Sequence, residues 1–481
     1  MSDPRSEPVS AQGVPAADGR AAVIDIDARI DAMPRVGLSA LGGAGLLLCY
    51  FFSNYDITVI ALVVPALLRE LQVSVLDLTH PVIWNLVGYC VGAYAFGRVA
   101  DRYGRQRGLV LTISLLGLGG GLSALSWDLA SFTLFRFLAG CGMGSVLALC
   151  STYIGEIAPK NKRGAYLVKL YTVQAVLLIA VGFASLPILA SSPTYGWRIL
   201  LAFGGLALLA LFMINGRGLH ESPRWLHAAG RTREAERLLL AMERRVRSAP
   251  GVQAAAARQD GVEVPDVAPA DPGTEARADQ AMPTLALFRP PYLRRMLIIL
   301  GFWFIYYIAV YGFLSYTPLL LESLGASPSG ALFVTVLGRL VTIIVPLLML
   351  ALIERIERRT LIVIGTLIMA AGLLVLLLPL GQVAASAGVL LINFGINFVV
   401  MPAFIYTAEI FPTRARGTAA AIGDGLGHLG GAIAPLVVLP VLVGFGGAAA
   451  VWVITGLTLL SGLIVTFGVR TRNRSLTEIA S

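Results

Sequence analysis

The feature that most constrains this chain is a succession of long apolar segments separated by polar loops. Blocks such as 41–67, 361–380 and 448–469 reach or exceed the roughly 20 residues that a helix needs to cross the hydrocarbon core of a bilayer. Water cannot satisfy backbone polar groups inside that core, so such segments must be helical. Only 14% of the 481 residues are charged, against about 25% in soluble chains. The sequence therefore predicts an all-α membrane protein.

Twelve membrane-spanning helices are predicted. Their expected ranges are 41–67, 81–100, 108–126, 131–155, 164–190, 198–215, 296–321, 330–353, 360–380, 385–408, 418–442 and 447–469. Lys and Arg cluster in alternate loops, and the intervening loops hold almost none. This is the pattern of the positive-inside rule, and it predicts an inner-membrane protein with both termini in the cytoplasm. The net charge of +9 is thus explained by topology, and nucleic-acid binding is not expected.

The polar segments divide the chain into five parts. We expect a disordered cytoplasmic tail at 1–35, a six-helix bundle at 36–215, a cytoplasmic loop at 216–292, a second six-helix bundle at 293–470 and a cytoplasmic tail at 471–481. Within the loop, the charged amphipathic stretch 231–247 predicts a short helix. The stretch 249–283 is rich in Ala, Pro, Gly and acidic residues and predicts a flexible linker.

Two motifs recur at the same interval, which indicates that the second bundle repeats the first. Asp101 lies in the charged loop after the second span, and Glu354 lies in its counterpart after the eighth. Glu156 ends the fourth span, and Glu409 ends the tenth. Both pairs are 253 residues apart (101 to 354 and 156 to 409). Parallel repeats of this kind build transporters whose substrate site lies between the two halves.

The motifs themselves carry a family resemblance. The loop Gly-Arg-Val-Ala-Asp-Arg-Tyr-Gly-Arg at 97–105 matches the signature G-x-x-x-D-R-x-G-R of the major facilitator superfamily, which the chain resembles. The stretches 136–144, Tyr55-Asp56 and Glu-Ser-Pro-Arg-Trp-Leu at 221–226 resemble the sugar-porter branch. The resemblance implies the major facilitator fold.

The seventh span departs from that branch, because it lacks the hexose-site motif Q-Q-x-x-G-x-N. In its seventh span and at Gly-His-Leu-Gly-Gly 427–431, the chain looks more like organic-ion transporters of the niacin, aromatic-acid and synaptic-vesicle-glycoprotein-like groups. The resemblance therefore favours an organic ion over a hexose as substrate.

The loop motifs resemble the gate and scaffold of the superfamily. Acidic residues beside arginines can form ion pairs between helices, and glycines permit close helix approach and a tight turn. The residues expected in this gate are Gly97, Asp101, Arg102, Gly104, Arg105, Glu156, Arg163, Glu221, Arg224, Glu354, Arg355, Glu409 and Arg416.

Ionisable side chains inside a span cost at least about 2.5 kcal/mol each, so each is a candidate functional group. Asp56 lies deep in the first span and Arg136 lies near the start of the fourth, at positions that match the coupling pair of proton-coupled sugar porters. Asp424 and His428 share one face of the eleventh span. We expect these four residues to take part in proton coupling. The alternatives are that Asp56 is a charge held by Arg136 without titrating, and that His428 is a packing residue.

Polar and aromatic side chains of other spans are expected to contact the substrate. Arg339 has no obvious local partner, so it either binds an anion or pairs with an acid such as Glu409. Uncharged amides facing a cavity can bind polar ligands, although hydrogen bonding between helices is the alternative. The expected set is Gln174, Trp303, Tyr307, Tyr311, Arg339, Asn393 and Asn397.

These observations favour a transporter over an enzyme. The sequence shows no phosphate-binding loop, metal-ligand cluster or nucleophile–base pair, and its four cysteines fall inside predicted spans. We expect no catalytic residue, cofactor or metal. The interpretation is a monomeric proton-coupled symporter of a small polar organic solute, an organic acid, in the lipid bilayer. A sugar or polyol symporter is the alternative; a drug/proton antiporter and a transporter-like sensor are less favoured.

Overall fold

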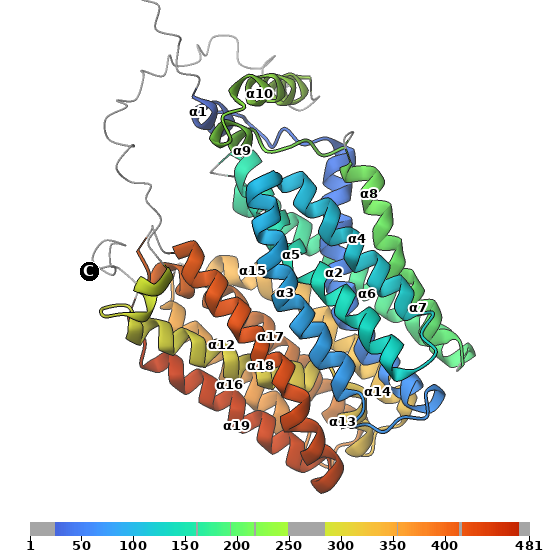
Figure 1. Ribbon diagram of the computed structural model, residues 1–481. Coiled ribbons are helices and arrows are strands. Elements are labelled where there is room, and N and C mark those ends of the chain that lie inside the picture. The colour runs from blue at the N-terminus through green and yellow to red at the C-terminus, as the bar shows by residue number, and fades with distance from the viewer. Residues whose placement is uncertain are drawn as a thin grey trace, which may run out of the picture.

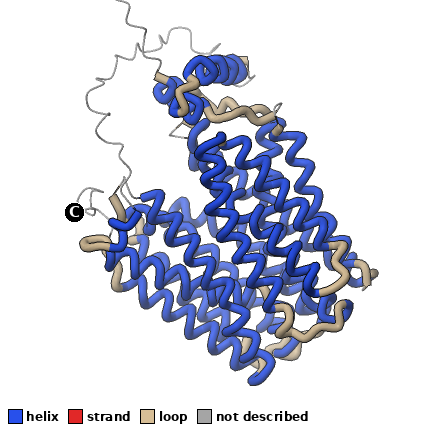
Figure 2. The backbone as a smooth tube through the Cα atoms, in the orientation of Figure 1, coloured by secondary structure: helices blue, strands red, loops and turns tan. Residues whose placement is uncertain are grey.

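The computed structural model describes residues 25–470 apart from gaps at 160–161, 193, 216–217, 249–283, 354 and 413–415. Within this part the chain is helical, with loops and no strand (Figure 2). The predicted all-α fold with two six-helix bundles is confirmed.

The first bundle contains six long helical segments. They are α2 (Ala40–Glu70), α3 (Thr79–Tyr103), α4 (Arg105–Ser123), α5 (Leu129–Ile157), α6 (Arg163–Ser191) and the continuous segment α7 (Gly196–Gly205), η1 (Leu206–Leu208) and α8 (Leu209–Ile214). The second bundle repeats this arrangement. It contains α12 (Leu293–Leu314) followed by α13 (Thr317–Ser323), the segment α14 (Pro328–Leu337), η3 (Gly338–Leu340) and α15 (Val341–Leu352), then α16 (Arg358–Val375), α17 (Gln382–Glu409), α18 (Arg416–Phe445) and α19 (Gly447–Thr466).

Ten helices of the described part are long and apolar enough to cross a membrane. The other two long helices are α3 and α4, which carry more polar residues but pack inside the first bundle against α5. They complete the twelve helices predicted from the sequence.

The helix starts follow local capping chemistry. Ser39 caps α2 by accepting the backbone N–H of Gly42 at 2.9 Å. Asp128 caps α5 in a reciprocal capping box with Ser131. These caps satisfy backbone groups that the first turn of a helix leaves unpaired.

Glycines set the closest helix contact in the first bundle, between α3 and α5. A Cβ at Gly92 would overlap the carbonyl of Cys141, and one at Gly140 would overlap the carbonyl of Asn85. Small residues let membrane helices approach until their backbones touch. The glycine-rich stretch 136–144 thereby fixes α5, and with it Arg136, against α3.

The short helices α1 (Ile26–Asp31), α9 (Pro223–Ala228) and α10 (Thr232–Arg247) gather at one end of the first bundle (Figure 1). We call this end of the molecule the α10 face. A bundle of six crossings returns the chain to the side where it entered, so both bundles begin and end on the α10 face. The remaining short helix, η2 (Thr284–Phe288), precedes α12.

Part of the segment predicted to be disordered is folded. In α1, Ile30 is fully buried and Arg29 pairs with Glu243 of α10 at 2.9 Å. The prediction of disorder over 1–35 is wrong for α1 because the surface that stabilises it comes from α9 and α10, about 200 residues later in the chain. Residues 1–24 lie outside the described part.

In the described part of the chain, the most extensive contacts between the two bundles are made by four pairs of helices. These are α3 with α18, α6 with α14, α6 with α15, and α2 with α13. The spaces between the bundles lie beside these contacts: one is enclosed by α2, α6, α12, α15 and α17, and another lies between α12 and the helices α2, α3 and α5.

Candidate functional site

A cavity of about 150 Å³ lies between the bundles, and residues near the middle of α2, α6, α12, α15 and α17 form its wall. Six of the seven residues predicted to contact substrate line this cavity. They are Gln174, Tyr307, Tyr311, Arg339, Asn393 and Asn397. Residues from distant parts of the sequence thus converge on one site between the halves.

Arg339 reaches the cavity from η3, the single 3-10 turn that interrupts its membrane helix. The turn packs tightly on α17, because a Cβ at Gly338 would overlap Val389 and Asn393. No ion pair joins Arg339 to an acidic side chain of the described residues. Glu409, the partner considered from the sequence, instead lies 3.3 Å from Arg358. A half-buried guanidinium without a carboxylate partner therefore faces the cavity.

The amides of α17 are partly satisfied by their own helix. Asn393 donates to the carbonyl of Val389 at 2.9 Å, and Asn397 donates to the carbonyl of Asn393 at 2.8 Å. The side-chain oxygen of Asn397 accepts a hydrogen bond of 3.2 Å from the hydroxyl of Tyr171 on α6. This bond joins the two bundles at the cavity, so the amides serve both the cavity wall and the contact between bundles.

Gln174 on α6 presents an unsatisfied polar atom. The residue is 2% exposed, and its side-chain oxygen has no hydrogen-bond partner among the described residues. A buried acceptor without a partner costs about 1–3 kcal/mol. A bound solute that donates an N–H or O–H would relieve that cost.

Trp303 is not part of the cavity wall. Its side chain is fully buried, and the indole N–H donates to Thr407 Oγ1 at 3.1 Å. It packs one helical turn away from Tyr307, which does line the cavity. Trp303 therefore leaves the set of residues predicted to contact substrate.

Sequence reasoning missed Tyr171, which lines the cavity beside Gln174. The two residues are three positions apart and share one face of α6. That spacing of two polar groups in an apolar helix was the signal that could have found it.

The predicted coupling pair is formed. Arg136 donates to Asp56 from both ends of its guanidinium, with Nη1 2.7 Å from Oδ1 and a second contact between Nη2 and Oδ2. Asp56 is 4% exposed and Arg136 is 1% exposed. Asn85 of α3 supports the pair by donating to the carbonyl of Arg136 at 2.8 Å. The geometry is a bidentate ion pair held between α2 and α5.

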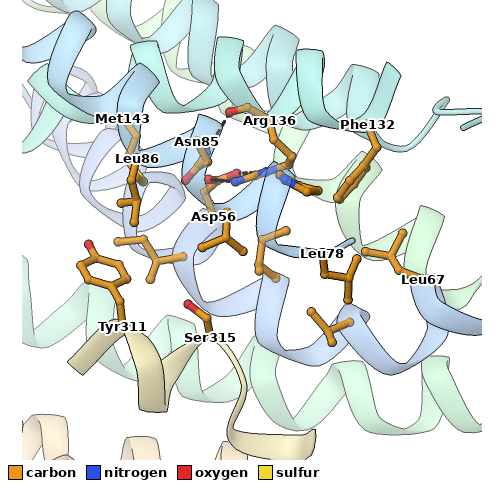
Figure 3. Close-up of a pocket in the computed structure, with 15 residues that line it drawn as sticks. Asp56, Leu67, Leu78, Asn85, Leu86, Phe132, Arg136, Met143, Tyr311 and Ser315 are labelled. Atoms are coloured by element: carbon orange, nitrogen blue, oxygen red, sulfur yellow. Dashed lines mark hydrogen bonds and ion pairs between the residues drawn. The ribbon is translucent and has the colours of Figure 1, made fainter. Parts of the chain in front are cut away.

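This pair lines a second cavity, shown in Figure 3. Asp56 and Arg136 face each other on one wall, while Tyr311 of α12 and Ser315, the residue that follows this helix, lie on the opposite wall. Tyr311 and Ile57 line both this cavity and the central one. The cavity that holds the ion pair and the central cavity therefore have these two residues in common.

Asp424 and His428 form part of an aromatic cluster between the bundles. Tyr307 donates to Asp424 Oδ1 at 2.8 Å, and His428 Nδ1 lies 3.5 Å from the same oxygen. The imidazole stacks on the ring of Tyr89 from α3, with centroids 4.1 Å apart and an angle of 13° between the planes. Tyr307 lies on its other side at 4.3 Å. The cluster therefore connects Tyr307, which lines the central cavity, to the stacking of His428 on Tyr89, which joins the two bundles.

The loop motif of the first bundle forms a charge network on the α10 face. Arg105 pairs with Asp101 and, through Nε at 3.0 Å, with Glu156. Glu221 accepts the backbone N–H of Arg105 at 2.8 Å and so caps the start of α4. Burial raises the pKa of Glu221 above its usual range. Gly104 adopts a φ of +111°, and a Cβ there would overlap Glu221, so the motif requires glycine at this position.

The other gate residues are placed as follows. Arg224 donates to the carbonyl of Gly155 at 3.1 Å and to Asp27 of α1 at 2.5 Å, and Arg102 lies over the ring of Tyr103. Gly97 has open space around it and Arg355 is exposed. Glu354 and the side chains of Arg163 and Arg416 lie outside the described residues.

Comparison with known proteins agrees with this architecture. The profile of the family described as "Sugar (and other) transporter" matches residues 46–481. The niacin transporter NiaP of Acinetobacter baylyi is 25% identical, over 95% of this chain and 100% of its own length. The 4-hydroxybenzoate transporter PcaK of Pseudomonas aeruginosa is 28% identical, over 85% of this chain and 87% of its own.

Among solved structures, the D-xylose-proton symporter aligns with a TM-score of 0.68 and 21% identity, covering 90% of this chain and 98% of its own. This likeness confirms the major facilitator fold. The chain is a multi-span membrane transporter, and it belongs to the Sugar (and other) transporter family.

Proposed function

We propose that the protein is a proton-coupled symporter of a small organic acid. The observation that carries this proposal is Arg339, a guanidinium at the central cavity without a carboxylate partner among the described residues. A partly buried cation without a counter-ion is costly, and a carboxylate can relieve that cost through two parallel charge-assisted hydrogen bonds. The aromatic wall of Tyr307 and Tyr311 suits the apolar part of such a solute.

The relatives support the same class of solute. Niacin and 4-hydroxybenzoate, which give two relatives their names, are both ring compounds that carry a carboxylate. The unsatisfied oxygen of Gln174 adds a position for a donor on the solute, such as a hydroxyl or a ring N–H. An acid with a carboxylate and one further polar group satisfies both ends of the cavity.

Proton coupling is proposed for the pair Asp56 and Arg136. A carboxylate enclosed in the membrane can change its protonation only when the surrounding helices admit protons, which ties its titration to the conformation of the bundles. The pair lies beside the central cavity and is buried in this conformation. Asp424 and His428 are proposed to contribute to the same coupling from the second bundle.

The proposed orientation follows the basic loops. The α10 face lies in the cytoplasm together with both termini, and the central cavity opens alternately to the two sides of the inner membrane. One chain supplies every residue of the proposed site, so the transporter is proposed to act as a monomer.

The test is a binding screen of the purified protein by thermal shift, with nicotinate, 4-hydroxybenzoate and D-xylose as probes. We expect the carboxylates to stabilise the protein and Arg339→Gln to weaken their binding about 10- to 100-fold, which corresponds to the loss of a charge-assisted hydrogen bond of about 1.5–3 kcal/mol. The matched control is Arg233→Gln, which removes an exposed arginine of α10 and should change nothing.

A single outcome would restore the sugar-porter alternative. If D-xylose binds equally to the wild type and to Arg339→Gln, and no carboxylate displaces it, the anion site is refuted. The cavity amides would then be the primary contacts of a neutral polyhydroxy solute.

A further inference from the structure

Helix α1 supplies two acidic side chains to an arginine at the start of α9. Arg224 donates through Nε to Asp27 at 2.5 Å and through Nη2 to Asp31 at 3.3 Å. Through Nη1 it also donates at 3.1 Å to the carbonyl of Gly155, near the end of α5. The donors of a guanidinium are fixed in one plane, so these three contacts together hold Arg224 in a single orientation.

The position of α1 is fixed by contacts that do not involve Arg224. Arg29 donates twice to Glu243 of α10, from Nε at 3.0 Å and from Nη2 at 2.9 Å. Ile26 and Ile30 are buried in the core of the first bundle. Helix α9 itself contacts α1, α5 and α10. The two acids are therefore held at Arg224 by a packed helix.

A carboxylate with one unpartnered oxygen lies next to this arginine along α5. Glu156 follows Gly155, and its Oε1 accepts a hydrogen bond of 3.0 Å from Arg105 Nε. Its Oε2 is buried and accepts no hydrogen bond from the described residues. Such an oxygen is unfavourable without a donor, and a guanidinium suits it well. Arg224 nevertheless makes no ion pair with Glu156 in the described part of the chain.

The charges around Glu156 should attract Arg224. Asp101 and Glu156 both pair with Arg105, and Glu221 accepts the backbone N–H of Arg105. In these contacts three carboxylates share one guanidinium. The two acids of α1 compete with this network for Arg224, and their contacts explain why it stays away from Glu156.

We propose that Asp27 and Asp31 are positioning residues of this network, which resembles the gate of the superfamily. They hold Arg224, so that Arg105 is the one arginine on Glu156 among the described residues. A second arginine on Glu156 would stabilise one conformation of the network over the other and shift the balance between them. The proposal rests on the transport function of the chain, and it uses the organic acid of the proposed function only as a probe in part of its test.

The first experiment is a double-mutant cycle between Asp27→Asn and Glu156→Gln. It is measured by thermal unfolding of the purified full-length protein, which needs no solute. When Asp27 is neutralised, Arg224 can turn to Glu156 and recover part of the lost stability. In Glu156→Gln that charged partner is missing, so Asp27→Asn should lower the unfolding temperature further there than in the wild type. Additive shifts would overturn the proposal, because the two acids would then not share one arginine.

The second experiment measures uptake and equilibrium binding of 4-hydroxybenzoate. We expect Asp27→Asn to slow uptake about two- to fivefold, as the loss of one partly exposed ion pair allows, with the affinity unchanged. Asp27→Glu should keep the wild-type rate, as should the matched control Glu234→Gln, which removes an exposed acid of α10. In the Glu156→Gln background, Asp27→Asn should slow uptake no further. An equal loss in both backgrounds would make Asp27 merely structural and overturn the proposal.

A charge exchange tests the docking of α1 itself. Arg29→Glu places two acids together, so it should release α1, speed hydrogen exchange over Ile26–Asp31 and slow uptake as Asp27→Asn does. Arg29→Glu with Glu243→Arg should restore both. Release of α1 with uptake at the wild-type rate would overturn the proposal. If the wild type does not transport 4-hydroxybenzoate, the proposed solute class loses that support, and the cycle measured by thermal unfolding still decides the role of Asp27.

Discussion

Asp56→Asn is the substitution that best separates coupling from folding. In the wild type, a pH difference of one unit across the membrane supplies about 1.36 kcal/mol per proton, enough for up to about tenfold accumulation of a neutral proton–acid pair. An asparagine at position 56 cannot release a proton. We therefore expect accumulation in proteoliposomes to fall to a ratio of about one, while counterflow exchange of preloaded solute continues.

The structure also sets the stability cost of this substitution. Arg136 is 1% exposed and donates to both oxygens of Asp56, so removal of the negative charge leaves a buried guanidinium without its counter-ion. Breaking a buried pair in this way costs about 3–5 kcal/mol. The double variant Asp56→Asn with Arg136→Gln removes the orphaned charge and should recover much of the thermal stability without recovering accumulation.

The assay compares pH-driven uptake, counterflow and thermal unfolding for the wild type, the two variants and the control Glu234→Gln, an exposed acid of α10. Uphill uptake by Asp56→Asn at the wild-type level would refute the reasoning and move the carrier role to Asp424. Recovery of accumulation by the double variant would equally refute it, because neither neutral side chain can carry the proton.

Three further predictions concern the gate, a helix cap and the aromatic cluster. Asp101→Asn should slow turnover yet leave equilibrium solute affinity within a few-fold, as comparison of uptake rates with binding will check. Glu221→Ala should cost about 1–2 kcal/mol of thermal stability, because the start of α4 loses its acceptor. Burial raises the folded-state pKa of Glu221 above the ordinary glutamate pKa of 4.5. The free energy of unfolding of the wild type should therefore fall as the pH rises from 4.5 through the folded-state pKa. A pH series of thermal melts should show no such slope for Glu221→Gln. His428→Gln should weaken the stacking on Tyr89 and reduce pH-driven accumulation in the uptake assay; unchanged accumulation would make His428 a packing residue.

The membrane helices and the repeat could be predicted from the sequence because their signals are local. A run of apolar residues forces a helix in lipid whatever surrounds it, so the twelve predicted ranges coincide with helical segments to within a few residues. The cavity residues were predictable for a related reason. A polar group such as Arg339 or Asn393 inside an apolar helix must face protein or water, and the space between the bundles supplies both.

The failures share one physical cause, which is a partner that the local sequence does not reveal. Trp303 satisfies its indole N–H on Thr407 of another helix, so it needs no contact with the cavity. Glu409 meets Arg358 rather than Arg339, because the ends of α16 and α17 place the first pair together at the α10 face. Helix α1 is stabilised by contacts with both α9 and α10, among them the ion pair of Arg29 with Glu243.

The two membrane cavities suggest how the proposed symport avoids a long coupling pathway. Ile57 and Tyr311 line both of them. The cavity that holds Asp56 and Arg136 and the proposed solute cavity therefore have two wall residues in common. Tyr311 belongs to α12 of the second bundle, whereas Asp56 and Ile57 belong to α2 of the first. Any rocking of one bundle against the other must therefore displace Tyr311 relative to the ion pair. A solute that binds Tyr311 and a proton that binds Asp56 therefore act on the same contact. No side chain beyond these is needed to carry the coupling free energy between solute and proton.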